Sequence, residues 1–94
     1  MLADDHSDDQ LTRLRARVAA LEAKRDELAD ALAEADHQAR RERDGLERAG
    51  GRAPALESRL ALLDEGRELT RQALEGTEAE LAAAEAALEE AEGY

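Results

Sequence analysis

The sequence contains no cysteine, no phenylalanine and no tryptophan, and it has one proline and one tyrosine. The absence of cysteine excludes disulfides and thiolate metal sites as supports for a chain of 94 residues. The absence of phenylalanine and tryptophan excludes a compact core built on aromatic packing. A chain this small must therefore depend on aliphatic packing between helices or strands, or on association with another chain.

Long apolar runs are also missing, and basic residues are fewer than acidic ones. The uninterrupted apolar segments are too short for a membrane-spanning helix. The first residues, MLADDHSDD, lack the basic and apolar regions of a signal peptide, so we expect a cytoplasmic protein. The formal net charge of −11 would repel nucleic acid and anionic membranes, and we expect neither as a partner.

The abundant residues are alanine, leucine, glutamate and arginine, a composition typical of long or coiled helices. Apolar residues recur at alternating intervals of three and four, as in a heptad repeat with Leu11 at position a and Leu14 at position d. The sequence therefore predicts an all-α fold with coiled-coil packing. The predicted core consists of Leu11, Leu14, Val18, Leu21, Leu28, Leu32, Leu46, Leu56, Leu60, Leu63, Leu74, Leu81 and Leu88.

Local signals divide this single predicted domain into four segments. They are a frayed acidic tail over 1–7, a first helix over 8–49, a turn over 50–53 and a second helix over 54–92. The first boundary depends on Ser7 and Gln10, which fit a capping box at a helix start. Within the second helix, Gly76 and the capping residues after it indicate an alternative, a break at 76–77.

Gly50, Gly51 and Pro54 interrupt the helical pattern at the middle of the chain. Glycine suits the left-handed residue just past a helix end, and proline suits the first position of the next helix. Folding the chain here places a residues opposite d residues and lays the basic segment 10–25 beside the acidic segment 72–94. We therefore expect an antiparallel helical hairpin.

The heptad register nevertheless runs unbroken from Leu46 through Ala53 to Leu60, as a continuous coiled coil requires. A proline inside such a helix would kink it. The alternative fold is therefore a long parallel coiled-coil dimer, kinked at Pro54.

The hairpin also predicts which charged side chains meet. A fold centred on Gly51 brings two like charges together at Asp36 and Asp64, and it places Arg67 opposite Ala35, from where the arginine can extend to solvent. The expected attractive pairs are Arg15–Glu85, Lys24–Glu80 and Arg43–Glu57.

Several clusters have residue types used in catalysis or metal binding but lack the required arrangement. The run Asp4–Asp9 has neither the glycine turn nor the distal glutamate of a calcium loop. The glutamates of 75–92 have no Glu-x-x-His pair, and His37 lies at an exposed f position. Acidic residues interleave Arg40–Arg43, and no aromatic residue accompanies it for stacking on bases. We expect solvated surface at each, with no catalytic, cofactor or metal site.

Leu62 and Leu69 lie at c positions, seven residues apart and away from the a/d seam. With Ala55 in line before them and Ala73 beside them, they widen the apolar face of the second helix beyond what one partner helix can cover. Isolated exposed leucines are the alternative interpretation. We expect contact with a second copy of the chain, a dimer being favoured, or with another helical protein.

The expected function is a non-enzymatic interaction or oligomerisation module with an assembly or adaptor role. One alternative is a structural coiled-coil spacer or filament-like rod. Another is a regulatory accessory subunit that binds a larger protein.

Overall fold

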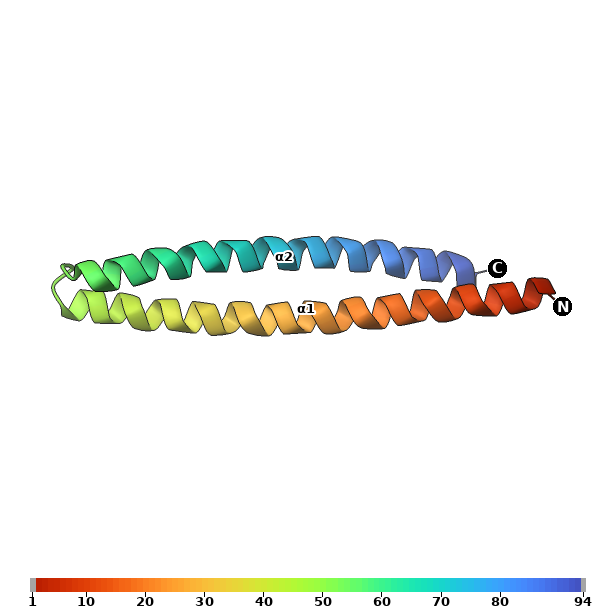
Figure 1. Cartoon of the computed structure of the whole chain (residues 1–94), viewed down its shortest axis with the longest axis horizontal. Helices are drawn as coiled ribbons and strands as arrows, with labels where there is room; N and C mark the ends of the chain where they lie inside the picture. Colours follow the sequence, from red (N-terminus) through yellow and green to blue (C-terminus); the bar gives the residue numbers. More distant parts are fainter. Residues whose placement is uncertain (1, 94) are drawn as a thin grey trace. The chain divides into compact units, whose positions relative to one another are not determined.

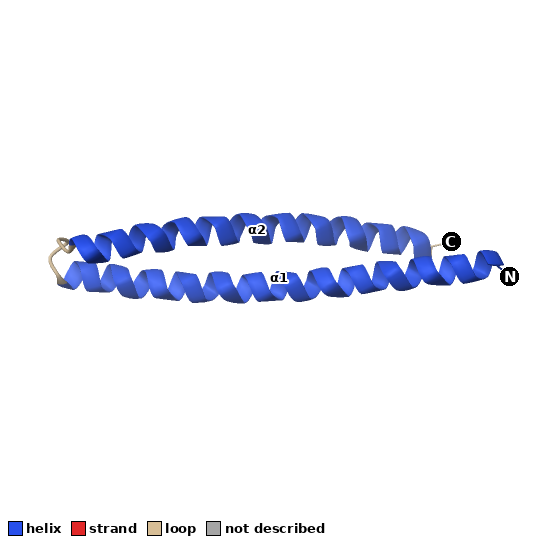
Figure 2. Cartoon of the chain, viewed as in Figure 1, coloured by secondary structure: helices blue, strands red, loops and turns tan. Residues whose placement is uncertain are grey.

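A computed structural model describes residues 2–93, with the side chains of residues 8–93. It contains two helices, α1 (Leu2–Arg48) and α2 (Pro54–Glu92), and all of its regular structure is helical (Figures 1 and 2). The helices run antiparallel and pack against each other. The predicted all-α hairpin is thus confirmed, and the alternative of a parallel rod kinked at Pro54 is wrong.

Two glycines form the turn that makes the hairpin. Gly50 and Gly51 have φ angles of 75° and 77°, left-handed values at which a residue with a Cβ atom would be strained. The N–H of Gly51 donates to the carbonyl of Leu46, and the N–H of Gly50 donates to that of Glu47, over 2.9 and 3.0 Å. This pair of bonds is a Schellman motif, which satisfies carbonyls left free at the end of a helix. It ends α1 at Arg48, one residue before the predicted boundary.

Pro54 is the first residue of α2, where its missing N–H costs no helical hydrogen bond. The N–H of Glu57 donates to the carbonyl of Ala53 over 2.9 Å and so begins the ladder of the helix. The acidic side chain of Glu57 in the first turn also complements the positive end of the helix dipole. Helix α2 ends at Glu92, as predicted, and it runs through 76–77 without a break.

The start of α1 corrects the sequence-based boundary. The helix begins at Leu2, so a tail ending at Ser7 is wrong, and Ser7 lies within the helix. No proline or glycine occurs in this segment. Serine and aspartate inside a helix cost at most about 0.7 kcal/mol each relative to alanine, which is too little to stop a helix that continues for many turns.

The heptad repeat determines which residues each helix turns toward the other. From Leu11 to Ala91 every a and d position is buried or half-buried, except Ala49 in the turn. Within the predicted core, the buried residues are Val18, Leu21 and Leu81. The half-buried ones are Leu11, Leu14, Leu28, Leu32, Leu46, Leu56, Leu60, Leu63, Leu74 and Leu88. A single neighbouring helix covers only part of each side chain, which explains why most are half-buried.

Contacts within the chain divide it into two compact units. Unit 1 comprises Met1–Asp26 and Glu75–Tyr94, and unit 2 comprises Glu27–Leu74. Each unit contains a part of both helices, because residues of a two-helix hairpin contact only those at a similar distance from the turn. Neither helix, over its described residues, combines the length and hydropathy needed to cross a membrane.

Unit 1 contains a small apolar core. Val18 and Leu21 of α1 pack with Leu81 and Ala84 of α2, and Leu88 packs against this cluster. Thr77 of α2 is also buried, with 3% of its surface exposed. No buried side-chain nitrogen or oxygen atom within residues 8–93 lacks a hydrogen-bond partner.

Unit 2 has fewer fully buried side chains. Ala39 is its one buried residue, and its remaining a and d positions are half-buried apart from Ala49. Charged residues occupy two of these seam positions, Glu42 and Arg67. The helices of unit 2 are therefore joined by polar contacts as well as by aliphatic ones.

Candidate interaction surface

Leu62 and Leu69 are the large apolar side chains that the described part of the chain leaves exposed, with exposed fractions of 68% and 62%. Both lie on α2 within unit 2, at c positions, while the a and d positions of that helix face α1. Because they are one heptad apart, they lie on the same side of the helix. The hairpin itself therefore does not cover them.

Small residues continue the line of these leucines along α2. Ala55 and Ala73 are exposed, as is Gly66, which lies between the two leucines. A Cβ atom built on Gly66 would meet nothing within 4 Å, so the hairpin does not require a glycine there. Glycine inside a helix is destabilising by roughly 0.5–1 kcal/mol relative to alanine. We call Ala55, Leu62, Gly66, Leu69 and Ala73 the α2 stripe.

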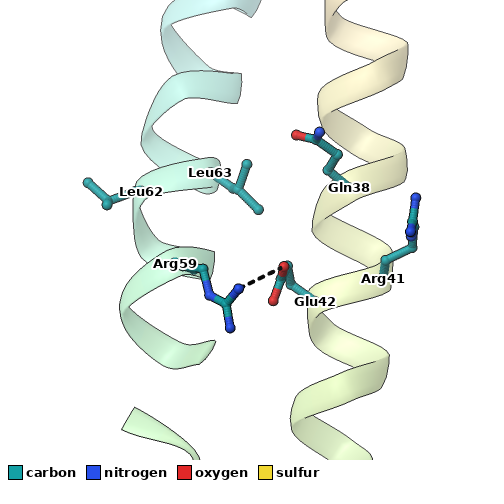
Figure 3. Close-up of a pocket in the computed structure, with 6 residues that line it drawn as sticks. All are labelled: Gln38, Arg41, Glu42, Arg59, Leu62 and Leu63. Atoms are coloured by element: carbon teal, nitrogen blue, oxygen red, sulfur yellow. Dashed lines mark ion pairs between the residues drawn. The ribbon is translucent and has the colours of Figure 1, made fainter. Parts of the chain in front are cut away.

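A groove of about 430 Å³ lies beside one end of this stripe (Figure 3). Leu63 points toward α1 and forms part of the groove, whereas Leu62 points away from α1. Nη1 of Arg59 on α2 lies 4.0 Å from Oε1 of Glu42 on α1, which joins the two walls. The full lining is Gln38, Arg41, Glu42, Arg59, Leu62 and Leu63. An apolar side chain from another helix could enter between these walls.

Arg67 connects the two helices of unit 2 through a pair of aspartates. Its Nε donates to Oδ1 of Asp36 on α1 over 2.7 Å, and its Nη1 donates to Oδ1 of Asp64 on α2 over 2.9 Å. Arg43 of α1 also donates to Asp64, over 3.1 Å. The hydrogen bonds to Asp36 and then to Asp64 raise the pKa of Arg67 above its ordinary value, so the guanidinium stays charged.

This arrangement corrects two sequence-based expectations. Asp36 and Asp64 were expected to repel each other, and Arg67 was expected to extend past Ala35 to solvent. Instead the guanidinium lies between the carboxylates and neutralises their repulsion. Only 19% of the Arg67 side chain is exposed, because its aliphatic part covers the seam while its charged end reaches both acids.

The flanking ion pairs also differ from the expected ones, each by one heptad. They are Arg15–Glu92 at 3.2 Å, Arg43–Asp64 at 3.1 Å and Arg17–Glu80 at 3.9 Å, in place of Arg15–Glu85, Arg43–Glu57 and Lys24–Glu80. Side chains on a helix tilt toward its N-terminus, so the two partners of an antiparallel pair tilt in opposite directions. For long side chains at e positions, such as Arg15 and Glu92, residues displaced along the axis therefore meet more easily than those directly opposite.

The other candidate clusters lie on the surface wherever their side chains are described. Within residues 8–93, no three His, Asp or Glu side chains lie where they could hold a metal ion. His37 is exposed, as are Arg40, Arg41 and Arg43. In the acidic run Asp4–Asp9, only Asp8 and Asp9 have described side chains, and both are exposed.

Comparison of the chain with protein-family models, with curated proteins and with solved structures finds no match. The surface must therefore be interpreted from its own residues. Sequence reasoning identified both leucines and both alanines of the α2 stripe, but it missed the groove. The groove lining comes from c, d and g positions of two helices, and these positions can be combined only when the pairing of the helices is known.

Proposed function

We propose that the chain is a non-enzymatic oligomerisation module in which the α2 stripe packs against a second copy. The exposure of Leu62 and Leu69 on a helix whose seam is already occupied by α1 carries this proposal. Burying a leucine side chain fully contributes about 1.5–3 kcal/mol. In a two-fold dimer each leucine is used twice, so the total is comparable with the stability of a small domain.

The small core of the hairpin supports the same function. The buried residues are Val18, Leu21, Ala39, Thr77, Leu81 and Ala84. With so few side chains fully buried, two helices alone are expected to have marginal stability. Association through a second apolar surface would add the burial that the isolated hairpin lacks.

Sedimentation across micromolar concentrations tests this function on the wild type, on Leu62→Glu/Leu69→Glu and on a matched control. The control is Ala16→Glu/Ala23→Glu, which adds two glutamates seven residues apart at exposed f positions. We expect the wild type and the control to associate as concentration rises, and the leucine variant to remain monomeric. A wild type that is monomeric throughout, or a leucine variant that associates as the wild type does, overturns the proposal.

A further inference from the structure

We propose that the two copies meet through an antiparallel two-fold contact in which Arg41 of one copy pairs with Glu34 of the other. In the same contact, Leu62 of one copy packs against Leu69 of the other. This inference rests on the proposed oligomerisation and adds the orientation of the copies and a pair of specificity-determining charges.

The placement of these four residues follows from the pairing of the helices. Arg41 on α1 and Leu62 on α2 line the same groove, and both occupy c positions (Figure 3). One heptad farther from the turn, the corresponding c positions are Glu34 on α1 and Leu69 on α2. These four residues, Glu34, Arg41, Leu62 and Leu69, form one face of the hairpin. The face has a leucine beside a cation at the end near the turn and a leucine beside an anion at the other end.

Glu34 and Arg41 are available for a partner. Both residues are exposed, and neither joins an ion pair within the described residues. By contrast, Arg43 and Asp36 on the same helix are bound to acids and bases of the hairpin itself. The charges on this face are thus not needed to hold α1 against α2.

Only an antiparallel contact makes this face complementary to itself. A two-fold axis near Gly66, between the two leucines, brings each end of the face onto the opposite end of the other copy. Arg41 then meets Glu34 twice, whereas a two-fold axis parallel to the helices would stack α1 of one copy on α2 of the other and place each charge opposite a leucine. Gly66 has open space around it, so the two α2 backbones can approach closely near the axis. The groove beside Leu62 can receive Leu69 of the other copy.

The distribution of charge favours a second copy as the occupant. Unit 2, which contains the whole face, has 11 acidic and eight basic residues, whereas unit 1 has 13 acidic and five basic residues. Like charges placed together oppose association. Contact through unit 2 therefore joins two copies at the part of the chain where their mutual repulsion is smallest.

Charge reversal tests the pairing through the variants Glu34→Arg, Arg41→Glu and the double variant that carries both. Each single reversal places like charges together at two points. It should therefore raise the dissociation constant of the dimer by about tenfold. The double variant restores opposite charges and should return to within about threefold of the wild type. The two single variants change the net charge in opposite directions, so a general charge effect cannot weaken both.

Sedimentation equilibrium measures the dissociation constants, and circular dichroism checks that each variant is as helical as the wild type. Arg40→Glu is the matched control for Arg41→Glu, because it makes the same charge change at an exposed neighbouring residue outside the face. This control should associate as the wild type does. Single reversals without effect, or losses that add in the double variant, overturn the antiparallel pairing. If Leu62→Glu/Leu69→Glu still abolishes association in that case, the oligomerisation module stands and only this geometry fails.

Discussion

Units 1 and 2 are built from the same two helices and the same heptad, but they hold the helices together differently. Unit 1 buries an aliphatic cluster from both helices, centred on Leu21 and Leu81. Unit 2 fully buries only Ala39 among its described residues, and it joins its helices through half-buried leucines and through ion pairs around Arg67. Burial of large aliphatic side chains stabilises a fold far more than exposed ion pairs do. We therefore expect the fully buried cluster to make unit 1 the more stable of the two units, although it contains the chain ends.

The exposed leucines lie in the unit with fewer fully buried side chains. Leu62 and Leu69 belong to unit 2, whose helices are joined by polar contacts. A segment of low intrinsic stability gains most from an additional partner, because binding adds free energy to the bound conformation alone. The two units would thus divide stability and association between them.

The largest expected effect on stability is that of truncating a seam leucine to alanine in unit 1, compared with the same truncation in unit 2. Leu81→Ala in unit 1 removes a side chain that is only 4% exposed and should lower the free energy of unfolding by about 2–4 kcal/mol. Leu63→Ala in unit 2 removes a half-buried side chain and should cost clearly less. Urea unfolding of both variants, followed by circular dichroism, measures the difference. Equal losses would remove the contrast between the units.

A smaller effect is expected at the turn in unit 2. Gly50→Ala places a Cβ atom at a φ of 75° and should lower the free energy of unfolding by roughly 1 kcal/mol. Pro54→Ala, at the first position of α2, should change it little, since this position makes no helical N–H bond. Thermal melts of the two variants make the test. A strong stabilisation by Pro54→Ala would show that this residue interrupts a continuous helix, against the hairpin.

The smallest expected effect concerns the ion pairs of unit 2. Arg67→Met leaves Asp36 and Asp64 without the guanidinium between them, so it should lower the melting temperature at low salt. The loss should shrink as sodium chloride is added, because salt screens the remaining repulsion. Arg71→Met is the control, as Arg71 pairs only with Glu68 on its own helix among the described residues. An equal, salt-independent loss in both variants would show that charge across the seam contributes nothing.

The pKa of Arg67 determines how this ion pair responds to pH. Its pKa is raised in the folded protein, so the stabilising contribution is fully present below the ordinary arginine value and is lost only as pH rises past the raised one. Both values lie above the range in which the protein would be studied. Salt is therefore the sharper variable for testing this contact.

Much of the fold could be predicted from sequence, because the seven-residue period of the heptad alone determines which positions form the seam between the helices. A heptad that starts at Leu11 identifies the positions that face the other helix, polar ones such as Thr77 and Arg67 included. The turn could be predicted because Gly50 and Pro54 have strong local preferences. The helix start at Leu2 could not, since a capping box at Ser7 is only a local preference that a continuing helix overrides.

The polar contacts were harder to predict than the seam. Which acid a flexible arginine reaches depends on the tilt of the side chains and on their displacement along the axis, and these are not contained in the heptad positions. Arg15 accordingly meets Glu92 and not Glu85. The exposed leucines were accessible to sequence reasoning because they break the heptad pattern, whereas the groove beside Leu62 required both helices.

Residue-resolved hydrogen exchange of the Leu62→Glu/Leu69→Glu variant tests most directly whether unit 1 holds the hairpin together. This variant removes the proposed self-association, so the amides report on the hairpin alone. The slowest exchange is expected around Val18–Leu21 and Leu81–Ala84, with faster exchange in the helical segments of unit 2. Slowest exchange beside the turn, decreasing toward the chain ends, would contradict the account.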